Sequence, residues 1–199
     1  MLTELIAANN FKRMPWKNGK GKRIELIAIH DPPTSELLCR LSIASVTLDD
    51  DFSDFSGCKR TLMMIAGNGM ALLHQSKEAQ IPTQTLTRQY QYCSFDGGWK
   101  TKAKLIDGPI TDFNIIFNPQ RVSSKVFVLK EGEVNEIENH ADELFLFAHK
   151  EPSTCPFFDD KVAKEIAIPI GDLLHITASD AAKMTITGEG LICVGIVNR

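Results

Sequence analysis

The 199-residue sequence lacks several features that would assign it to a class at once. No apolar run approaches the roughly 20 residues that a membrane-spanning helix requires. Residues 1–10 have neither the basic start nor the small-residue cleavage site of a signal peptide. The formal net charge of −3 provides no basic surplus, which nucleic-acid-binding domains usually have. We therefore expect neither a membrane nor a nucleic acid as a partner.

Cysteine pairs and metal-ligand spacings are also missing. The five cysteines lie far apart and form no CxxC pair, which suits reduced thiols in a cytoplasmic protein better than a disulfide framework. The five histidines form no HxH, HxxxH or HExxH spacing, and the acidic stretch 136–143 is better explained as a charged loop. There is no GxSxG nucleophile elbow either. The sequence predicts a cytoplasmic protein without a metal or another cofactor.

Helical periodicity is scarce, and short apolar runs that alternate with polar residues dominate the chain. Turn signals such as Gly67-Asn68-Gly69 and Asp107-Gly108-Pro109 separate these runs. Many short strands at this spacing predict an all-β sandwich or barrel. A weak internal repeat aligns residues 102–117 with 182–197 and places Gly108 and Gly188 at the same turn. We therefore expect two small barrels, residues 1–118 and residues 119–199.

Polar side chains alternate with apolar ones in two of the expected strands. Arg40 and Ser42 share one face of the first strand, and Asp112 and Asn114 share one face of the second. One interpretation is a wetted outer face. The other is a barrel interior that holds a small polar ligand. In that case Arg40 and Arg60 are natural partners for carboxylates, and two such arginines favour a dicarboxylate.

The basic stretch 15–23 (PWKNGKGKR) leaves two interpretations open as well. A glycine-spaced basic loop can hold an anion through backbone N–H groups, and Trp16 needs a place to bury its ring. The alternative is a solvated hairpin turn, because the spacing is not that of a P-loop and a β-like run follows it.

Four motifs occur in the same order over residues 15–114. They are PWKNGKG at 15–21 followed by Glu25, RLSIASV at 40–46, FSDFSGCKRTL at 52–62 followed by GNG, and CSFDG at 93–97 followed by LIDGPITDFN at 105–114. Together they resemble the HutD/Ves family of bacterial proteins. Arg23-Ile24 replaces the Thr-Arg that the family commonly shows before the glutamate. If that family arginine helps to hold a ligand, its charge would come from Arg23 or Lys22 in this chain.

The resemblance implies a double cupin, with two small barrels in one chain. Residues 168–176 also resemble the cupin turn and strand with a PxGD signature, formed here by Pro169, Gly171 and Asp172. A metal cupin would carry a ligand histidine shortly after such a strand, and this chain has Ala181-Ala182 there. For HutD-type members the resemblance implies a link to histidine utilisation, with a regulatory role and no established catalysis.

The sequence and the resemblance together predict a HutD-like protein that binds a small acidic metabolite, such as an acylated glutamate or urocanate. We expect the pocket in the first barrel, because the specific motifs lie there. The expected ligand-binding residues are Trp16, Asn18, Glu25, Arg40, Ser42, Arg60, Asp112 and Asn114.

Two other functions stay open from the sequence. One is a metal-independent cupin enzyme, an isomerase, hydrolase or lyase, with Glu25 or Asp112 as general base. The other is a structural or protein-binding module, which would show an exposed apolar patch. Cupin-type barrels have edge strands that pair between subunits, so we expect a homodimer.

Overall fold

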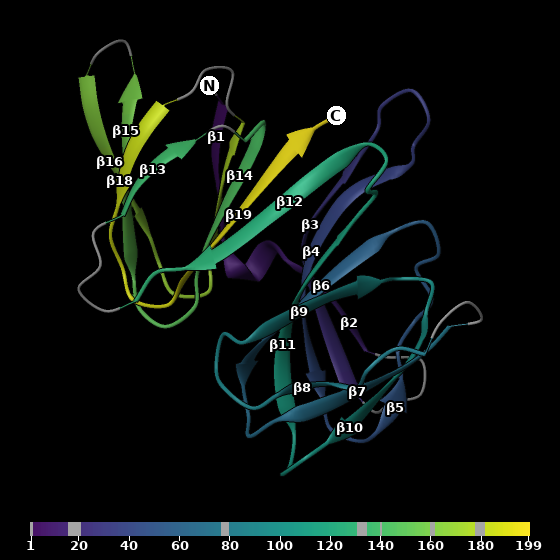
Figure 1. Ribbon diagram of the computed structural model, residues 1–199. Helices are drawn as coiled ribbons and strands as arrows, with labels where there is room; N and C mark the ends of the chain where they lie inside the picture. Colours follow the sequence, from purple (N-terminus) through teal and green to yellow (C-terminus); the bar gives the residue numbers. More distant parts are fainter. Residues whose placement is uncertain are drawn as a thin grey trace. The chain divides into compact units, whose positions relative to one another are not determined.

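The computed structural model describes residues 2–15, 21–76, 80–130, 135–139, 141–159, 162–177 and 182–199. The chain divides into two compact units. We call residues 12–121 the first barrel, and residues 1–11 with 122–199 the second barrel. No helix in the described part of the chain has the length and hydropathy that a membrane crossing requires. The prediction of an all-β protein is confirmed (Figure 1).

The first barrel consists of two antiparallel sheets. The six-stranded sheet has the order β2 (Lys12–Pro15), β3 (Gly21–His30), β4 (Leu37–Val46), β11 (Ile110–Phe117), β6 (Lys59–Ala66) and β9 (Tyr92–Asp96). The four-stranded sheet has the order β5 (Asp50–Asp51), β10 (Lys100–Leu105), β7 (Met70–Gln75) and β8 (Gln84–Leu86). A buried apolar cluster with members from both sheets, among them Leu62, Leu72 and Phe95, fills one part of the interior.

The second barrel is built around a five-stranded antiparallel sheet. Its order is β1 (Leu2–Ile6), β17 (Leu173–Thr177), β14 (Glu143–Ala148), β19 (Leu191–Asn198) and β12 (Val122–Val128). Two two-stranded sheets complete it, β13 (Asn135–Asn139) with β18 (Ala182–Ile186) and β15 (Ser153–Asp159) with β16 (Val162–Ile168). A short 3₁₀ turn, η1 (Ala8–Asn10), follows β1.

The repeat seen in the sequence corresponds to a repeated structural element. In the first barrel β10 turns into β11, and in the second barrel β18 turns into β19. Both turns contain a glycine with positive φ, +77° at Gly108 and +145° at Gly188, a conformation that side chains with a Cβ rarely adopt. Each of the two following strands occupies an inner position in its sheet. This is the arrangement of two fused barrels of the same type.

The first eleven residues pack with the second barrel, whereas the sequence predicts them in the first. Strand β1 pairs with β17 along its whole length, from Leu2 opposite Thr177 to Ile6 opposite Leu173. The Ala8 amide then donates a 2.8 Å hydrogen bond to Oδ1 of Asp172, the aspartate of the PxGD turn. A pairing between residues about 170 positions apart leaves no local signal, so sequence reasoning missed it.

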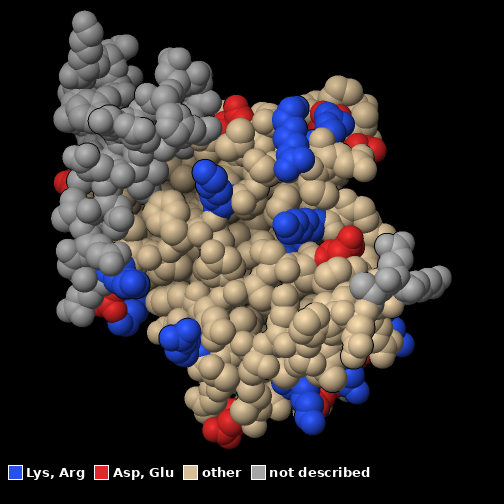
Figure 2. Space-filling model, in the orientation of Figure 1, with Lys and Arg blue, Asp and Glu red and all other residues tan. Residues whose placement is uncertain are grey.

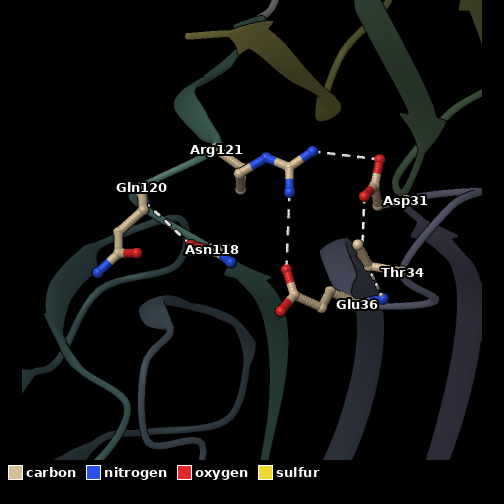
Figure 3. Close-up of polar contacts among 6 residues, drawn as sticks. All are labelled: Asp31, Thr34, Glu36, Asn118, Gln120 and Arg121. Carbon is tan, nitrogen blue, oxygen red and sulfur yellow. Dashed lines mark hydrogen bonds and ion pairs between the residues drawn. The ribbon is translucent and has the colours of Figure 1, made fainter.

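The segment that ends the first barrel is fixed to the turn between β3 and β4 (Figure 3). Nη2 of Arg121 lies 3.2 Å from Oδ1 of Asp31, and its Nη1 lies 3.6 Å from Oε2 of Glu36. The Thr34 hydroxyl donates to Oδ2 of Asp31 over 2.7 Å. That hydrogen bond, followed by the charge of Arg121, holds the pKa of Asp31 below its usual value. Residue 121 therefore belongs to the first barrel, three residues beyond the predicted boundary.

Candidate ligand-binding site

A cavity of about 550 Å³ occupies the polar part of the first barrel. Alternate residues of β4, β6 and β11 point to the same side of the six-stranded sheet, and the register sets Asn114 beside Ser42, with Ile116 between Arg40 and Arg60. At one end of the three strands the inward-pointing residues, such as Val46 and Met64, belong to the apolar cluster. Toward the other end polar residues, such as Arg40 and Asn114, take their place. The polar residues line the cavity and are not on a wetted outer face, since Ser42, Asp112 and Asn114 are at most 2% exposed.

A chain of hydrogen bonds joins three buried polar residues of the cavity wall, Arg60, Asn114 and Asp112. Arg60 donates from both Nε and Nη2 to Oδ1 of Asn114, at 2.8 and 2.6 Å. Asn114 donates from Nδ2 to Oδ1 of Asp112. The Nε–Nη2 edge of Arg60 is therefore occupied within the protein. The acceptor that takes this edge lies 54 positions away in the sequence, and Arg60 itself, which lines the cavity, stays a predicted carboxylate partner.

Burial shifts the pKa values of both charged ends of this chain. Burial lowers the pKa of Arg60 to about 10, against the stabilising charge of Asp112. Burial raises the pKa of Asp112 to about 6, against the charge of Arg60 and the hydrogen bond from Asn114. Oδ2 of Asp112 is buried and has no hydrogen-bond partner among the described residues. The carboxylate thus keeps one unsatisfied acceptor in the cavity wall, a costly arrangement for a buried polar group.

Arg40 contributes the available cation of the cavity. Its Nε is buried and has no hydrogen-bond partner in the described part of the chain. Its guanidinium lies over the Phe55 ring, 4.6 Å from the centroid. Burial, followed by the charge of Arg23, lowers the pKa of Arg40, and Glu25 opposes the shift. A guanidinium ordered by an aromatic ring and lacking a carboxylate partner is suited to bind an anion.

The structure also places in the cavity wall Arg23, one of the two residues named above as a replacement for the family arginine, and two phenylalanines that the sequence did not single out as ligand contacts. The buried Nε of Arg23 has no partner among the described residues. Cζ of Arg60 lies 4.2 Å from the centroid of the Phe52 ring, and Cζ of Arg40 lies over Phe55 in the same way, at 4.6 Å. The FSDF motif contains both phenylalanines. A sequence does not show how far these two rings lie from the arginines. The distances in the structure are what indicate that the rings order the two guanidinium groups.

Of the remaining predicted site residues, the structure describes only Glu25. Glu25 is opposite Ser42 in the β3–β4 register but does not line the cavity, and its Oε1 is 3.8 Å from Nζ of Lys12. Its negative charge acts on Arg40 instead. Trp16 and Asn18 lie outside the described residues.

Two of the described histidines, His74 and His175, have hydrogen-bond partners within the protein. His74 is buried in the first barrel, with Nδ1 2.8 Å from the Thr101 hydroxyl and Nε2 3.2 Å from Oε1 of Gln84. His175 in the second barrel lies 2.6 Å from Oε2 of Glu143 and stacks on Phe145. Over the described residues, no three His, Cys, Asp or Glu side chains gather in the way a metal ion requires.

The two barrels and their repeated element define an all-β double cupin, and solved structures agree. The oxalate decarboxylase of Lactobacillus farciminis, solved as a formate complex, has a TM-score of 0.68 at 10% identity. The alignment covers 96% of this chain and 85% of that one. This likeness shows the fold alone, and it confirms the double-cupin prediction.

The HutD family model matches residues 8–194, so the chain belongs to the HutD family. The structure of HutD from Pseudomonas fluorescens SBW25, in a formate condition, has a TM-score of 0.82, 25% identity and full coverage of both chains. A 21.2 kDa protein from the hutC 3′ region of Pseudomonas putida is 33% identical over 123 residues, 62% of each chain. Protein Ves of Citrobacter koseri is 32% identical over 123 residues, 60% of this chain and 61% of that one. The alignments thus span about 60% of the length of these curated relatives.

Proposed function

We propose that this HutD-family protein is a non-catalytic binding protein for a small acidic metabolite, which it holds in the cavity of the first barrel. The observation that carries the proposal is Arg40, a partly buried guanidinium whose Nε faces no acceptor among the described residues. A carboxylate would supply that acceptor through a charge-assisted hydrogen bond. Arg23, with the same unsatisfied atom in the same cavity, adds to the positive potential there.

The comparisons support a link to histidine utilisation. The P. putida relative is named for its position beside hutC. A protein that binds a pathway intermediate without converting it can restrain the pathway by sequestering it. The alignments cover only about 60% of the length of the curated relatives. Sequestration of a pathway intermediate is therefore a proposal for this chain.

Charge distribution supports the view that small molecules, and not polyanions or membranes, are the partners. Figure 2 shows Lys and Arg side chains in separate places on the face in view, with Asp and Glu among them and uncharged surface between. The net charge of −3 gives no long-range attraction for an anion, so local contacts must provide the affinity. The five free cysteines suit a reducing cytoplasm. A homodimer paired through edge strands remains part of the proposal.

Binding is tested by thermal shift and calorimetry with formate, urocanate and N-acetylglutamate. A ligand specific for the native state raises Tm, by an amount that corresponds to about 2.7 kcal/mol at a ligand concentration of 100 Kd. Arg40→Met should abolish the response while the protein stays folded. Lys125→Met, which removes an exposed cation from β12 of the second barrel, is the matched control and should respond like the wild type. An unchanged Tm with every carboxylate tested would overturn the proposal.

A second candidate function is catalysis with Asp112 as general base. The observation in its favour is the pKa of about 6 at a buried carboxylate in the cavity wall. Glu25 is less suitable, because it does not line the cavity. Turnover of a bound carboxylate that disappears in Asp112→Asn while binding survives would favour the enzyme. Ligand recovered unchanged after long incubation favours the binding protein.

A further inference from the structure

The cavity wall has an acceptor side as well as a cationic side. Oδ1 of Asp112 accepts the hydrogen bond from Asn114, which fixes the orientation of the carboxylate. Oδ2 is then the atom left without a partner in the described part of the chain, at a residue that is 0% exposed. A buried carboxylate oxygen in this state is stabilised by an N–H or O–H donor and destabilised by another negative charge.

The charged groups around Asp112 do not satisfy this oxygen. Asp112 lies between Ala44 of β4 and Met64 of β6 in the register, so the nearest side chains across the sheet are apolar. Arg60 of β6 acts on Asp112 through its charge, while its Nε–Nη2 edge is bonded to Asn114. The other charged residues that line the same cavity come from three further strands: Arg23 of β3, Arg40 of β4, and Asp50 and Asp51 of β5.

We propose that Asp112 is the specificity-determining residue of this cavity: it selects a ligand with one carboxylate and, at the other end, an N–H or O–H donor, and it rejects a dicarboxylate. The inference rests on the proposed function, because Arg40 must first hold the carboxylate of the ligand. One end of the ligand then pairs with the guanidinium of Arg40, whose Nε has no partner among the described residues, and the other end pairs with Oδ2 of Asp112, which likewise has none there. The sequence favours a dicarboxylate because it offers both Arg40 and Arg60 as carboxylate partners. The hydrogen bonds from Arg60 to Asn114 are the reason why the proposal departs from that expectation.

This selectivity should depend on pH in a defined direction. Burial raises the pKa of Asp112 to about 6, so the carboxylate is ionised at pH 8 and becomes protonated as the pH falls to about 5. A protonated Asp112 donates a hydrogen bond from Oδ2 and no longer repels a second carboxylate. Discrimination against a dicarboxylate should therefore be strong at pH 8 and weak at about pH 5.

Succinamate and succinate test the inference, because they have nearly the same shape and differ only in an amide or a carboxylate at one end. By calorimetry at pH 8 the wild-type protein should bind succinamate at least about tenfold more tightly, which corresponds to 1.4 kcal/mol. Asp112→Asn keeps an acceptor for Asn114 and replaces Oδ2 by an N–H donor, so the preference should reverse. Asp107→Asn, at an exposed turn outside the cavity, loses the same charge and should keep the wild-type preference.

A pH series on the wild-type protein gives an independent test if Asp112→Asn does not fold. The succinamate preference should fall toward unity between pH 8 and about pH 5. Running Asp112→Asn in parallel, when it folds, corrects for the titration of succinate itself. A preference that is the same in Asp112→Asn and at both pH values overturns the inference.

The outcomes also separate this inference from the proposed function. If both compounds bind equally and Arg40→Met abolishes both, the carboxylate-binding function stands and the role of Asp112 is wrong. If neither compound binds the wild-type protein, the inference is overturned. The wider carboxylate panel then decides whether the proposed function falls with it.

Discussion

The two barrels have the same type of fold and very different interiors. Among the residues whose burial is described, Ser153 is the buried polar side chain of the second barrel, and its interior cluster has apolar members such as Leu129, Leu146 and Ile176 at 0–2% exposure. The first barrel has an apolar cluster in one part and a buried Arg60–Asn114–Asp112 chain in the other. The difference shows that the fold does not require polar groups inside. Burial of polar groups is costly, and the binding function proposed above would account for their presence in the first barrel.

Corresponding strands show where the difference arises. Asp112 of β11 lines the cavity of the first barrel, whereas Leu191 and Cys193 of β19 belong to the apolar cluster of the second barrel. The strand of the second barrel that repeats β11 thus contributes apolar side chains to its interior and no buried carboxylate. The binding chemistry proposed for the first barrel therefore depends on a few side chains placed in an otherwise repeated frame.

The largest expected effect comes from placing a polar group in the apolar interior. Leu146→Asn should lower the free energy of unfolding by about 3–5 kcal/mol, because it removes buried aliphatic volume and buries an unsatisfied amide. Urea denaturation followed by fluorescence measures the change. Asn118→Leu, at a half-buried site in the first barrel's last turn, provides a control that should cost about 1 kcal/mol or less. A similar small cost for Leu146→Asn would show that the second barrel tolerates polar groups inside.

A smaller effect should follow from breaking the polar chain of the first barrel. Arg60→Met should cost about 2–4 kcal/mol at pH 8, because it leaves Asp112 buried as an unpaired charge. The loss of Arg60 raises the folded-state pKa of Asp112 further above its unfolded value. The folded state then binds more protons than the unfolded state, so the penalty should shrink as the pH falls toward about 5.

The control for this prediction is the double variant Arg60→Met/Asp112→Asn, which removes both charges. It should recover a large part of the stability at pH 8, and its unfolding free energy should vary less with pH than that of the single variant. A pH-independent penalty in Arg60→Met would mean that Asp112 is not the group left uncompensated.

Local alternation explains which parts of this structure were predictable. The two-residue period of strands shows from sequence alone that Asp112 and Asn114 share a face, as do Arg40 and Ser42. Turn residues such as Gly108 mark the strand ends in the same way. These local rules are sufficient for the all-β class and for much of the cavity lining.

Long-range pairing explains what the sequence could not show. Strand β1 joins the second barrel by pairing with β17, and Arg60 is bonded to an acceptor on another strand. Neither partner is near in sequence, and many alternatives satisfy the same pattern. The roles of Phe52 and Phe55 depend in the same way on distances to guanidinium groups. The partners of these residues can therefore be identified only once the strands are assembled in the structure.

The smallest expected effect is a difference in labelling rate among the cysteines. These rates compare the interiors of the two barrels without any substitution that alters stability. Burial raises the pKa of Cys155 to about 11 and that of Cys93 to about 12, and raises that of Cys193 further. Cys58 is half-buried in the first barrel, with a more modest rise. Since the thiolate is the reactive form, iodoacetamide at pH 8 should label Cys58 first. Peptide mass spectrometry over time gives the order.

The order of the slower cysteines then compares the two barrels directly. Cys93 packs against the interior of the first barrel and is half-buried, while Cys155 and Cys193 belong to the fully buried apolar cluster of the second. If the polar interior makes the first barrel open more readily, Cys93 should react before Cys155 and Cys193, which need local unfolding. A carboxylate bound in the cavity should slow Cys93 alone. Equal labelling rates for Cys93 and Cys155, unaffected by ligand, would show that both barrels open in one cooperative step.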